Sequence, residues 1–211
     1  NGDSLHDYSF QKTTTLRYGE NPHQSASLFT FDNLSRKNIA NADIIQGKEL
    51  SYNNIVDADA AWECVREFEH PACVIVKHAN PCGVAESVSI FNAYDLAFKT
   101  DPTSAFGGII AFNKIVDHQT ALEINSRQFV EVVIAPGYVD EAIKEFSSKK
   151  NIRVLNVDIK QDNLYPGIIK KVSGGILVQD DDLKSVRIED VKCVTTRKPS
   201  ENEIKDLMFA W

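Results

Sequence analysis

The sequence lacks any apolar run that could cross a membrane. No stretch approaches the roughly 18 consecutive apolar residues that a membrane-spanning helix needs. The first residues, Asn1–Ser4, contain neither the basic region nor the apolar core of a secretory signal peptide. They also lack a starting methionine, and we expect a chain that has been cut or processed at this end. We therefore expect a protein without a membrane partner.

The sequence also lacks cysteines at the close spacing typical of redox or metal-binding motifs. The chain has four cysteines, none of them in a Cys-x-x-Cys motif: Cys64, Cys73, Cys82 and Cys193. Two of them, Cys64 and Cys73, lie in apolar runs and are expected to be small core residues. A reduced, cytoplasmic protein without disulfides is the simplest interpretation.

There is no excess of positive charge. The formal net charge is −7 at pH 7, whereas surfaces that bind nucleic acid usually carry a basic excess. This balance argues against a nucleic-acid partner. It still allows one small phosphorylated ligand, which needs only a few local cations. Neither a Walker A loop nor a G-x-G-x-x-G fingerprint is present to bind it.

The chain does carry buried strands that alternate with amphipathic helices. Short apolar runs are typical of strands at 72–77, 108–112, 130–135, 152–157, 175–178 and 191–194. Helical spacing of apolar residues predicts helices at 54–68, with Asn54 as the N-cap, and at 90–98. Residues 118–127 and 140–149 are predicted to be helices as well. This alternation predicts an α/β protein of three layers, with helices on both faces of the sheet.

The C-terminal residues predict one more helix. Ser200 and Glu203 have the spacing of a capping box. Apolar residues then recur at helical spacing up to Trp211, where the sequence stops with the apolar face still open. We expect residues 199–211 to be the start of a truncated helix.

Two polar segments are candidates for chemistry. In Arg17–Gln24 (RYGENPHQ), a turn gathers a cation, a phenol, a carboxylate and an imidazole. A solvated loop would have the same composition. In Val76–Gly83 (VKHANPCG), a buried strand runs into a Lys-His pair and a Pro-Gly turn. Ligands bind α/β sheets where strands end, and the histidine could act there as a general base or merely cap the strand.

Two further segments are less specific. Asp101–Gly108 (DPTSAFGG) places small hydroxyl residues and paired glycines before a strand. Glycine allows a ligand to approach the backbone closely, but a tight turn into a strand explains the pattern equally well. Ile134–Tyr138 (IAPGY) is a strand followed by a turn and indicates no function by itself.

Taken together, the motifs resemble a known family. Six of them occur in family order: Arg17–Gln24, Gly47–Asn54 (GKELSYNN), Lys77–Gly83, Ser104–Gly107, Ile134–Tyr138 and Gly174–Gln179 (GGILVQ). The sequence is similar to the AICAR transformylase domain of the AICAR transformylase/IMP cyclohydrolase family, a bifunctional family of purine biosynthesis, in its bacterial form. The likeness covers almost the whole chain.

The resemblance implies an organisation for the whole protein. The family's transformylase domain contains two copies of a fold like that of cytidine deaminases, with a mixed sheet between helices. Residues 16–198 would be the first copy, and 1–15 would lead in from a cyclohydrolase domain that carries the IMP cyclohydrolase activity. The second copy would follow residue 211. A fragment of this kind is expected to be inactive alone.

The resemblance also implies a reaction and roles for residues. The family transfers a formyl group from 10-formyltetrahydrofolate, the co-substrate, to the 5-amino group of AICAR. It uses no metal and forms homodimers with active sites across the interface. The matching residues are His78 as catalytic base, Lys77 as stabiliser of the transition state, Arg17 and Tyr18 as nucleotide-binding residues, and Gly107 as a backbone contact. Glu131 aligns where some members place a substrate-contacting aspartate.

Three alternatives remain open. A zinc deaminase would need the pattern H-x-E followed by P-C-x-x-C, but Asn80 stands where its glutamate belongs and no second cysteine follows. An enzyme with Cys82 as nucleophile lacks an identifiable base. A nucleotide-binding or assembly module without catalysis is the third alternative.

Overall fold

The computed structural model describes residues 9–32, 34–160, 167–182 and 184–211. The chain forms two compact units, one in Asn1–Asn163 and one in Leu164–Trp211. Each unit is described by itself. Among the described residues, no helix is long and apolar enough to span a membrane.

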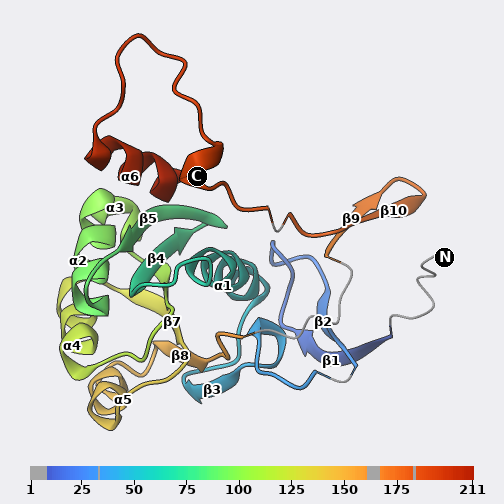
Figure 1. The fold of residues 1–211 in the computed structure, drawn as a ribbon. Coiled ribbons are helices and arrows are strands. Elements are labelled where there is room, and N and C mark those ends of the chain that lie inside the picture. The colour runs from blue at the N-terminus through green and yellow to red at the C-terminus, as the bar shows by residue number, and fades with distance from the viewer. Residues whose placement is uncertain (1–8, 33, 161–166, 183) are drawn as a thin grey trace. The chain divides into compact units, whose positions relative to one another are not determined.

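A mixed sheet of six strands forms the centre of the first unit (Figure 1). Its order is β3-β8-β7-β6-β4-β5, with parallel pairs β6–β7 and β7–β8 and antiparallel pairs elsewhere. The strands are β3 (Asp43–Gln46), β4 (Ala72–Lys77), β5 (Asn80–Glu86), β6 (Gly108–Phe112), β7 (Val130–Ala135) and β8 (Arg153–Asn156). The predicted strands near 72, 108, 130 and 152 are confirmed.

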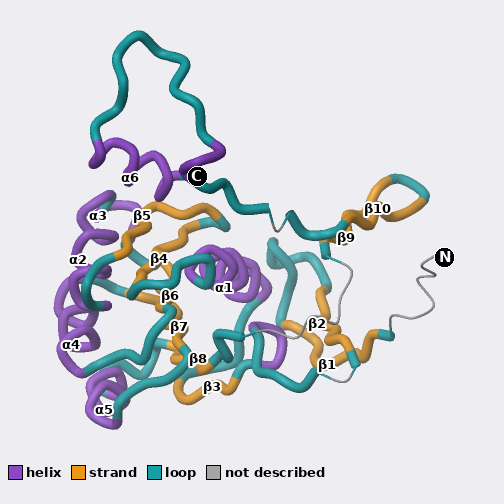
Figure 2. Tube along the Cα trace, in the orientation of Figure 1, coloured by secondary structure: helices purple, strands orange, loops and turns teal. Residues whose placement is uncertain are grey.

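Helices cover both faces of this sheet (Figure 2). On one face, α1 (Tyr52–Val65) and the short 3₁₀ helix η2 (Ile39–Asn41) pack on side chains such as Val74. The other face packs against α2 (Ile90–Thr100), α4 (His118–Arg127) and α5 (Asp140–Ser147). Because successive strand residues point to opposite faces, Cys73 belongs to this second core. The three-layer α/β arrangement predicted from the sequence is confirmed.

Helix α1 begins earlier than predicted, and its N-cap is Ser51 instead of Asn54. The Ser51 hydroxyl accepts a hydrogen bond from the Asn54 N–H at 3.1 Å, and the Asn54 side chain accepts one from the Ser51 N–H at 3.2 Å. This reciprocal capping box satisfies two amide groups that the helix cannot pair internally. The helix ends at Val65, so the predicted extension to 68 is also wrong.

The predicted Pro-Gly turn after Lys77 is wrong, because Pro81–Gly83 lies inside β5. The turn is two residues long and is formed by His78 and Ala79. Pro81 is tolerated because β5 is an edge strand, where a missing N–H need not be paired. Helix α2 packs so closely that a Cβ atom on Gly83 would lie 2.1 Å from the Ala97 carbonyl oxygen.

Several elements were not predicted. An antiparallel hairpin of β1 (Phe10–Leu16) and β2 (Ala26–Phe31) precedes the sheet. The turn expected within Arg17–Gln24 lies between these strands and is confirmed by the hydrogen bond from the Gly19 N–H to the Gln24 carbonyl at 2.8 Å. The short helix α3 (Pro102–Ala105), capped by Asp101, replaces part of the turn expected before β6.

The second unit contains a hairpin and a helix. Its elements are β9 (Ile168–Val172), β10 (Gly175–Gln179), the 3₁₀ helix η3 (Ile188–Asp190) and α6 (Glu201–Ala210). The predicted strand at 175–178 and the capping box of Ser200 and Glu203 are confirmed. The predicted strand at 191–194 is wrong: the segment pairs with no strand among the described residues, and β-branched composition without a partner does not make a strand.

Candidate active site

Lys77 and Gly107 meet at one end of the sheet. Lys77 is the last residue of β4, and its ammonium Nζ donates a hydrogen bond to the Gly107 carbonyl at 2.9 Å. Gly107 adopts a φ of +70°, which favours glycine. A Cβ atom at this position would lie 3.0 Å from the Lys77 Nζ. Because Gly107 has no side chain, the Lys77 ammonium can occupy this position.

His78 lies at the tip of the hairpin between β4 and β5. His78 and Ala79 have φ values of 53° and 57°, and Lys77 pairs with Asn80 across the turn. Positive φ at both central residues is the arrangement of a type I′ turn, which usually contains asparagine and glycine. Here two residues with Cβ atoms occupy it, at a cost of about 1–2 kcal/mol each. Backbone strain of this kind concentrates at functional sites.

Two side chains bind the backbone of this strained turn. The Asp57 carboxylate of α1 accepts a hydrogen bond from the Ala79 N–H at 2.8 Å. The Asn80 side-chain amide donates to the His78 carbonyl at 2.8 Å. The imidazole of His78 itself is left exposed at the tip.

Glu131 contacts the same helix from β7. The buried Asn54 donates from its side-chain amide to the Glu131 carboxylate at 2.8 Å. Glu131 is half-buried and lies next to Val130, which pairs with Gly108 in the neighbouring strand. The carboxylate of Glu131 therefore lies on the face covered by α1, near the end of the sheet that carries Gly107.

Arg17 and Tyr18 lie at the end of β1. The Arg17 guanidinium carbon is 5.6 Å from the centre of the Tyr18 ring, within the range of a cation–π contact. Arg17 is exposed, and it forms no ion pair with any carboxylate in the described part of the chain. The adjoining loop contacts α1, because the Asn53 side-chain amide donates to the Glu20 carbonyl at 3.3 Å.

Helix α1 thus connects the predicted site residues. The structure joins Lys77 to Gly107 by a hydrogen bond, and His78 follows Lys77 in the chain. Glu131 and the loop after Arg17 are connected to this turn through the first two turns of α1. Sequence reasoning missed the three residues that make these contacts: Asn53, Asn54 and Asp57. The available signal was the Ser-x-x-Asn spacing that opens α1, since such a box fixes which residues lie in the first turn.

The remaining sequence motifs have structural explanations. The Tyr138 hydroxyl lies 3.0 Å and 2.8 Å from the carbonyl oxygens of Val133 and Leu155. Burial raises the pKa of the Tyr138 hydroxyl well above its usual range, so the phenol joins two strands as a hydrogen-bonding group. Burial also raises the pKa of the Cys82 thiol, with Asp101 adding to the effect. A raised pKa makes Cys82 a weaker nucleophile.

Metal ligands are not clustered in the described part of the chain. It contains no group of three or more histidine, cysteine or acidic side chains placed to hold a metal ion. This geometry gives no support to the zinc-deaminase alternative.

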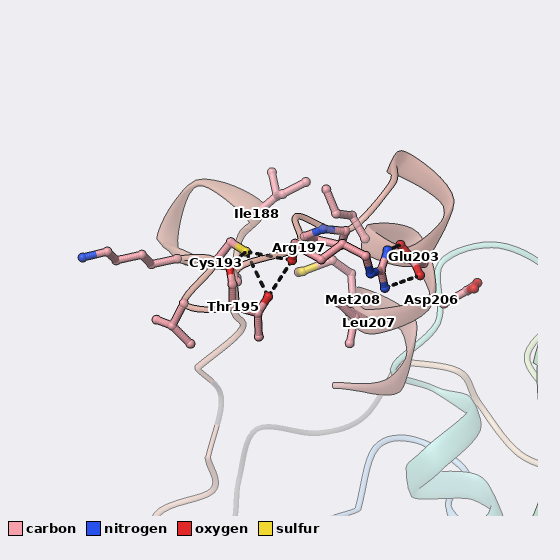
Figure 3. A pocket seen from close by; sticks show the side chains of 13 residues that line it. Ile188, Cys193, Thr195, Arg197, Glu203, Asp206, Leu207 and Met208 are labelled. Atoms are coloured by element: carbon pink, nitrogen blue, oxygen red, sulfur yellow. Dashed lines mark hydrogen bonds and ion pairs between the residues drawn. The ribbon is translucent and has the colours of Figure 1, made fainter.

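The second unit has a pocket of its own, of about 670 Å³ (Figure 3). It lies between the segment around Cys193 and helix α6, and none of the predicted site residues lines it. The Arg197 guanidinium binds both oxygens of the Glu203 carboxylate, at 2.8 and 2.9 Å. Mainly because of this pairing, the pKa of Glu203 is lowered to about 2.

The sequence was also compared with models of known protein families. The model of a family described as AICARFT/IMPCHase bienzyme matches residues 3–211. The match covers both units and includes every candidate site residue.

Proposed function

The chain belongs to the AICARFT/IMPCHase bienzyme family, and from this premise we propose that it carries the nucleotide-side half of an active site for formyl transfer. The reaction moves the formyl group of 10-formyltetrahydrofolate to the 5-amino group of AICAR. The observation that carries the proposal is the strained turn of His78 and Ala79 beside Lys77 and Gly107, because a costly backbone conformation next to an ammonium group has no evident structural purpose.

His78 is the general base in this proposal. The amino group of AICAR is a poor nucleophile, because its lone pair is conjugated with the imidazole carboxamide. Its nitrogen attacks the formyl carbon while His78 accepts the proton that the amine loses. The C–N bond to tetrahydrofolate then breaks, and the folate nitrogen leaves with a proton. The exposed tip of the hairpin leaves the imidazole open to a substrate.

Lys77 stabilises the charge that develops on the formyl oxygen. An ammonium group has three N–H donors, and one of them is used by the Gly107 carbonyl. The other two are available to an oxyanion. Because this hydrogen bond fixes the position of the ammonium before substrate binds, the charge is stabilised without reorganisation at the moment of reaction.

The nucleotide is held by the remaining residues. Arg17 binds the 5′-phosphate, for which its planar pair of donors is suited, and Tyr18 lies beside it. The Gly107 N–H is already bonded to the Phe129 carbonyl at 2.8 Å, so its carbonyl, with a second lone pair, is the group that meets the nucleotide. Glu131 accepts a substrate hydrogen bond. The folate site is completed by other segments in a homodimer.

The deciding experiment is a formyl-transfer assay of the full gene product with AICAR and 10-formyltetrahydrofolate. We expect turnover, and we expect His78→Ala to lower kcat by about 10²–10⁴ while the fold survives. The control is His70→Ala, since His70 is an exposed histidine outside the site. A wild-type protein that binds AICAR but forms no formylated product would refute the proposed reaction. A fully active His78→Ala variant would remove His78 from it.

A further inference from the structure

We propose that Asp57 is a positioning residue that holds the His78–Ala79 turn in its left-handed conformation. This inference rests on the proposed function of His78 as the general base. A two-residue hairpin pairs only its flanking residues, so the N–H groups of its two central residues have no partner within the turn. The Asp57 carboxylate accepts a hydrogen bond from one of these N–H groups, that of Ala79, at 2.8 Å.

This hydrogen bond matters because the left-handed conformation of the turn costs free energy. Alanine has no side-chain group that could compensate for a left-handed conformation, yet Ala79 has a φ of 57°. If this residue relaxed to negative φ, the turn would change type and His78 would change direction. A charge-assisted hydrogen bond to the backbone opposes that relaxation.

Because Asp57 belongs to helix α1, its hydrogen bond fixes the position of the turn relative to that helix. Asp57 is half-buried in the second turn of the helix, after the Ser51–Asn54 capping box. Three residues earlier, Asn54 binds Glu131 at 2.8 Å. The same rigid helix therefore positions the turn that carries His78 and the carboxylate of Glu131.

The test compares three variants in the formyl-transfer assay. We expect Asp57→Ala to lower kcat by about tenfold or more, with KM for AICAR changed less than about twofold, because the base is misplaced while nucleotide contacts remain. Asp57→Asn keeps an oxygen acceptor and should retain most of kcat. In Asp57→Ala/Ala79→Gly, kcat should partly recover, since glycine adopts positive φ without strain.

Matched controls come from the same helix. Asp59→Ala and Asp59→Asn make the same changes at an exposed position two residues further along α1, and both should leave kcat unchanged. Alanine is the best helix former, so Asp57→Ala is expected to fold, which circular dichroism checks.

Amide hydrogen exchange separates this inference from the proposed function. In the wild-type chain the Ala79 amide should be protected, and Asp57→Ala should remove that protection while Asp57→Asn keeps it. If formyl transfer is absent from the wild type, the proposed function fails while the exchange data still test the turn. The inference is overturned by an unprotected Ala79 amide in the wild type, by an unchanged kcat in Asp57→Ala, or by equal losses in the alanine and asparagine variants.

Discussion

At the scale of single residues, the candidate site depends on backbone conformations that most side chains disfavour. Gly107 has a positive φ next to the Lys77 ammonium, and His78 and Ala79 have positive φ without being glycine. The first case costs little, because glycine has no Cβ atom. The second costs free energy that the surrounding contacts must offset.

Gly107→Ala should impair the site more than the fold. A Cβ atom would lie 3.0 Å from the Lys77 Nζ and would force the ammonium away from its carbonyl partner. We expect kcat to fall about tenfold or more, because hydrogen bonds of charged groups contribute about 1.5–3 kcal/mol. The control is Gly174→Ala, since Gly174 has a φ of +79° but no neighbour within 4 Å. Equal effects of both variants on kcat would contradict the role given to Gly107.

Arg17→Ala should weaken nucleotide binding. The guanidinium has no carboxylate partner in the described part of the chain, so a phosphate is free to pair with it. Calorimetry should show about a tenfold or larger increase in Kd for AICAR. Lys12→Ala, in the adjoining strand, should have little effect. The phosphate role is wrong if the nucleoside without its phosphate loses as much affinity as the nucleotide does.

At the scale of elements, the packing of α2 on β5 depends on a glycine that looked like part of a turn. A Cβ atom on Gly83 would lie 2.1 Å from the Ala97 carbonyl oxygen, and that atom belongs to helix backbone that cannot easily move. We expect Gly83→Ala to lower the free energy of unfolding by about 1–3 kcal/mol, the usual cost of overpacking. Urea unfolding measures it. Gly175→Ala is the control, because its nearest neighbour lies at 4.0 Å, and a loss of similar size there would contradict the steric explanation.

Most of the buried elements were predictable from the sequence, whereas the exposed β1–β2 hairpin was not. The strand Gly108–Phe112 is a continuous apolar run, and Ile90–Thr100 repeats apolar residues at helical spacing. The β1–β2 hairpin is mostly exposed, so its composition carries little periodic signal. Pro81 and Gly83 suggested a turn because their local preferences dominate the pattern. Their place in β5 follows from tertiary packing that the sequence does not display.

The residues of the candidate site were named from the sequence, but the contacts between them were not. Lys77 and Gly107 lie together because β4 ends and the neighbouring strand β6 begins there, a sheet order that the strand pattern did not specify. Asn54 was predicted only as a helix cap and Asp57 only as a helix residue, and the fold alone shows which segments their side chains reach. Contacts between residues distant in sequence depend on sheet order, which local patterns do not specify.

At the scale of the whole molecule, the cysteines distinguish the two units. Cys193 is exposed in the second unit, whereas Cys73 is fully buried in the sheet of the first. Burial raises the pKa values of Cys64 and Cys82 as well, so both present less thiolate near neutral pH.

A thiol reagent such as DTNB should therefore react in distinct phases. We expect one fast thiol, Cys193, and a last thiol, Cys73, that reacts only when the first unit unfolds. Cys193→Ser should remove the fast phase and leave the others unchanged. Persistence of the fast phase in that variant, or rapid labelling of Cys73 in the folded protein, would contradict the burial described above.

The outer pairing of the sheet also bears on how the chain is synthesised. The edge strand β3 pairs with β8, and the Gln46 side chain binds the Ile152 carbonyl, 106 positions later in the sequence. At about 5–20 residues per second, a ribosome delivers β8 roughly 5–20 s after β3. Among the described strands β3 pairs only with β8, so it lacks this partner throughout that interval, and an unpaired strand can associate with other chains. Newly made protein is thus most exposed to aggregation before its last central strand emerges, when a ribosome-associated chaperone would protect it most.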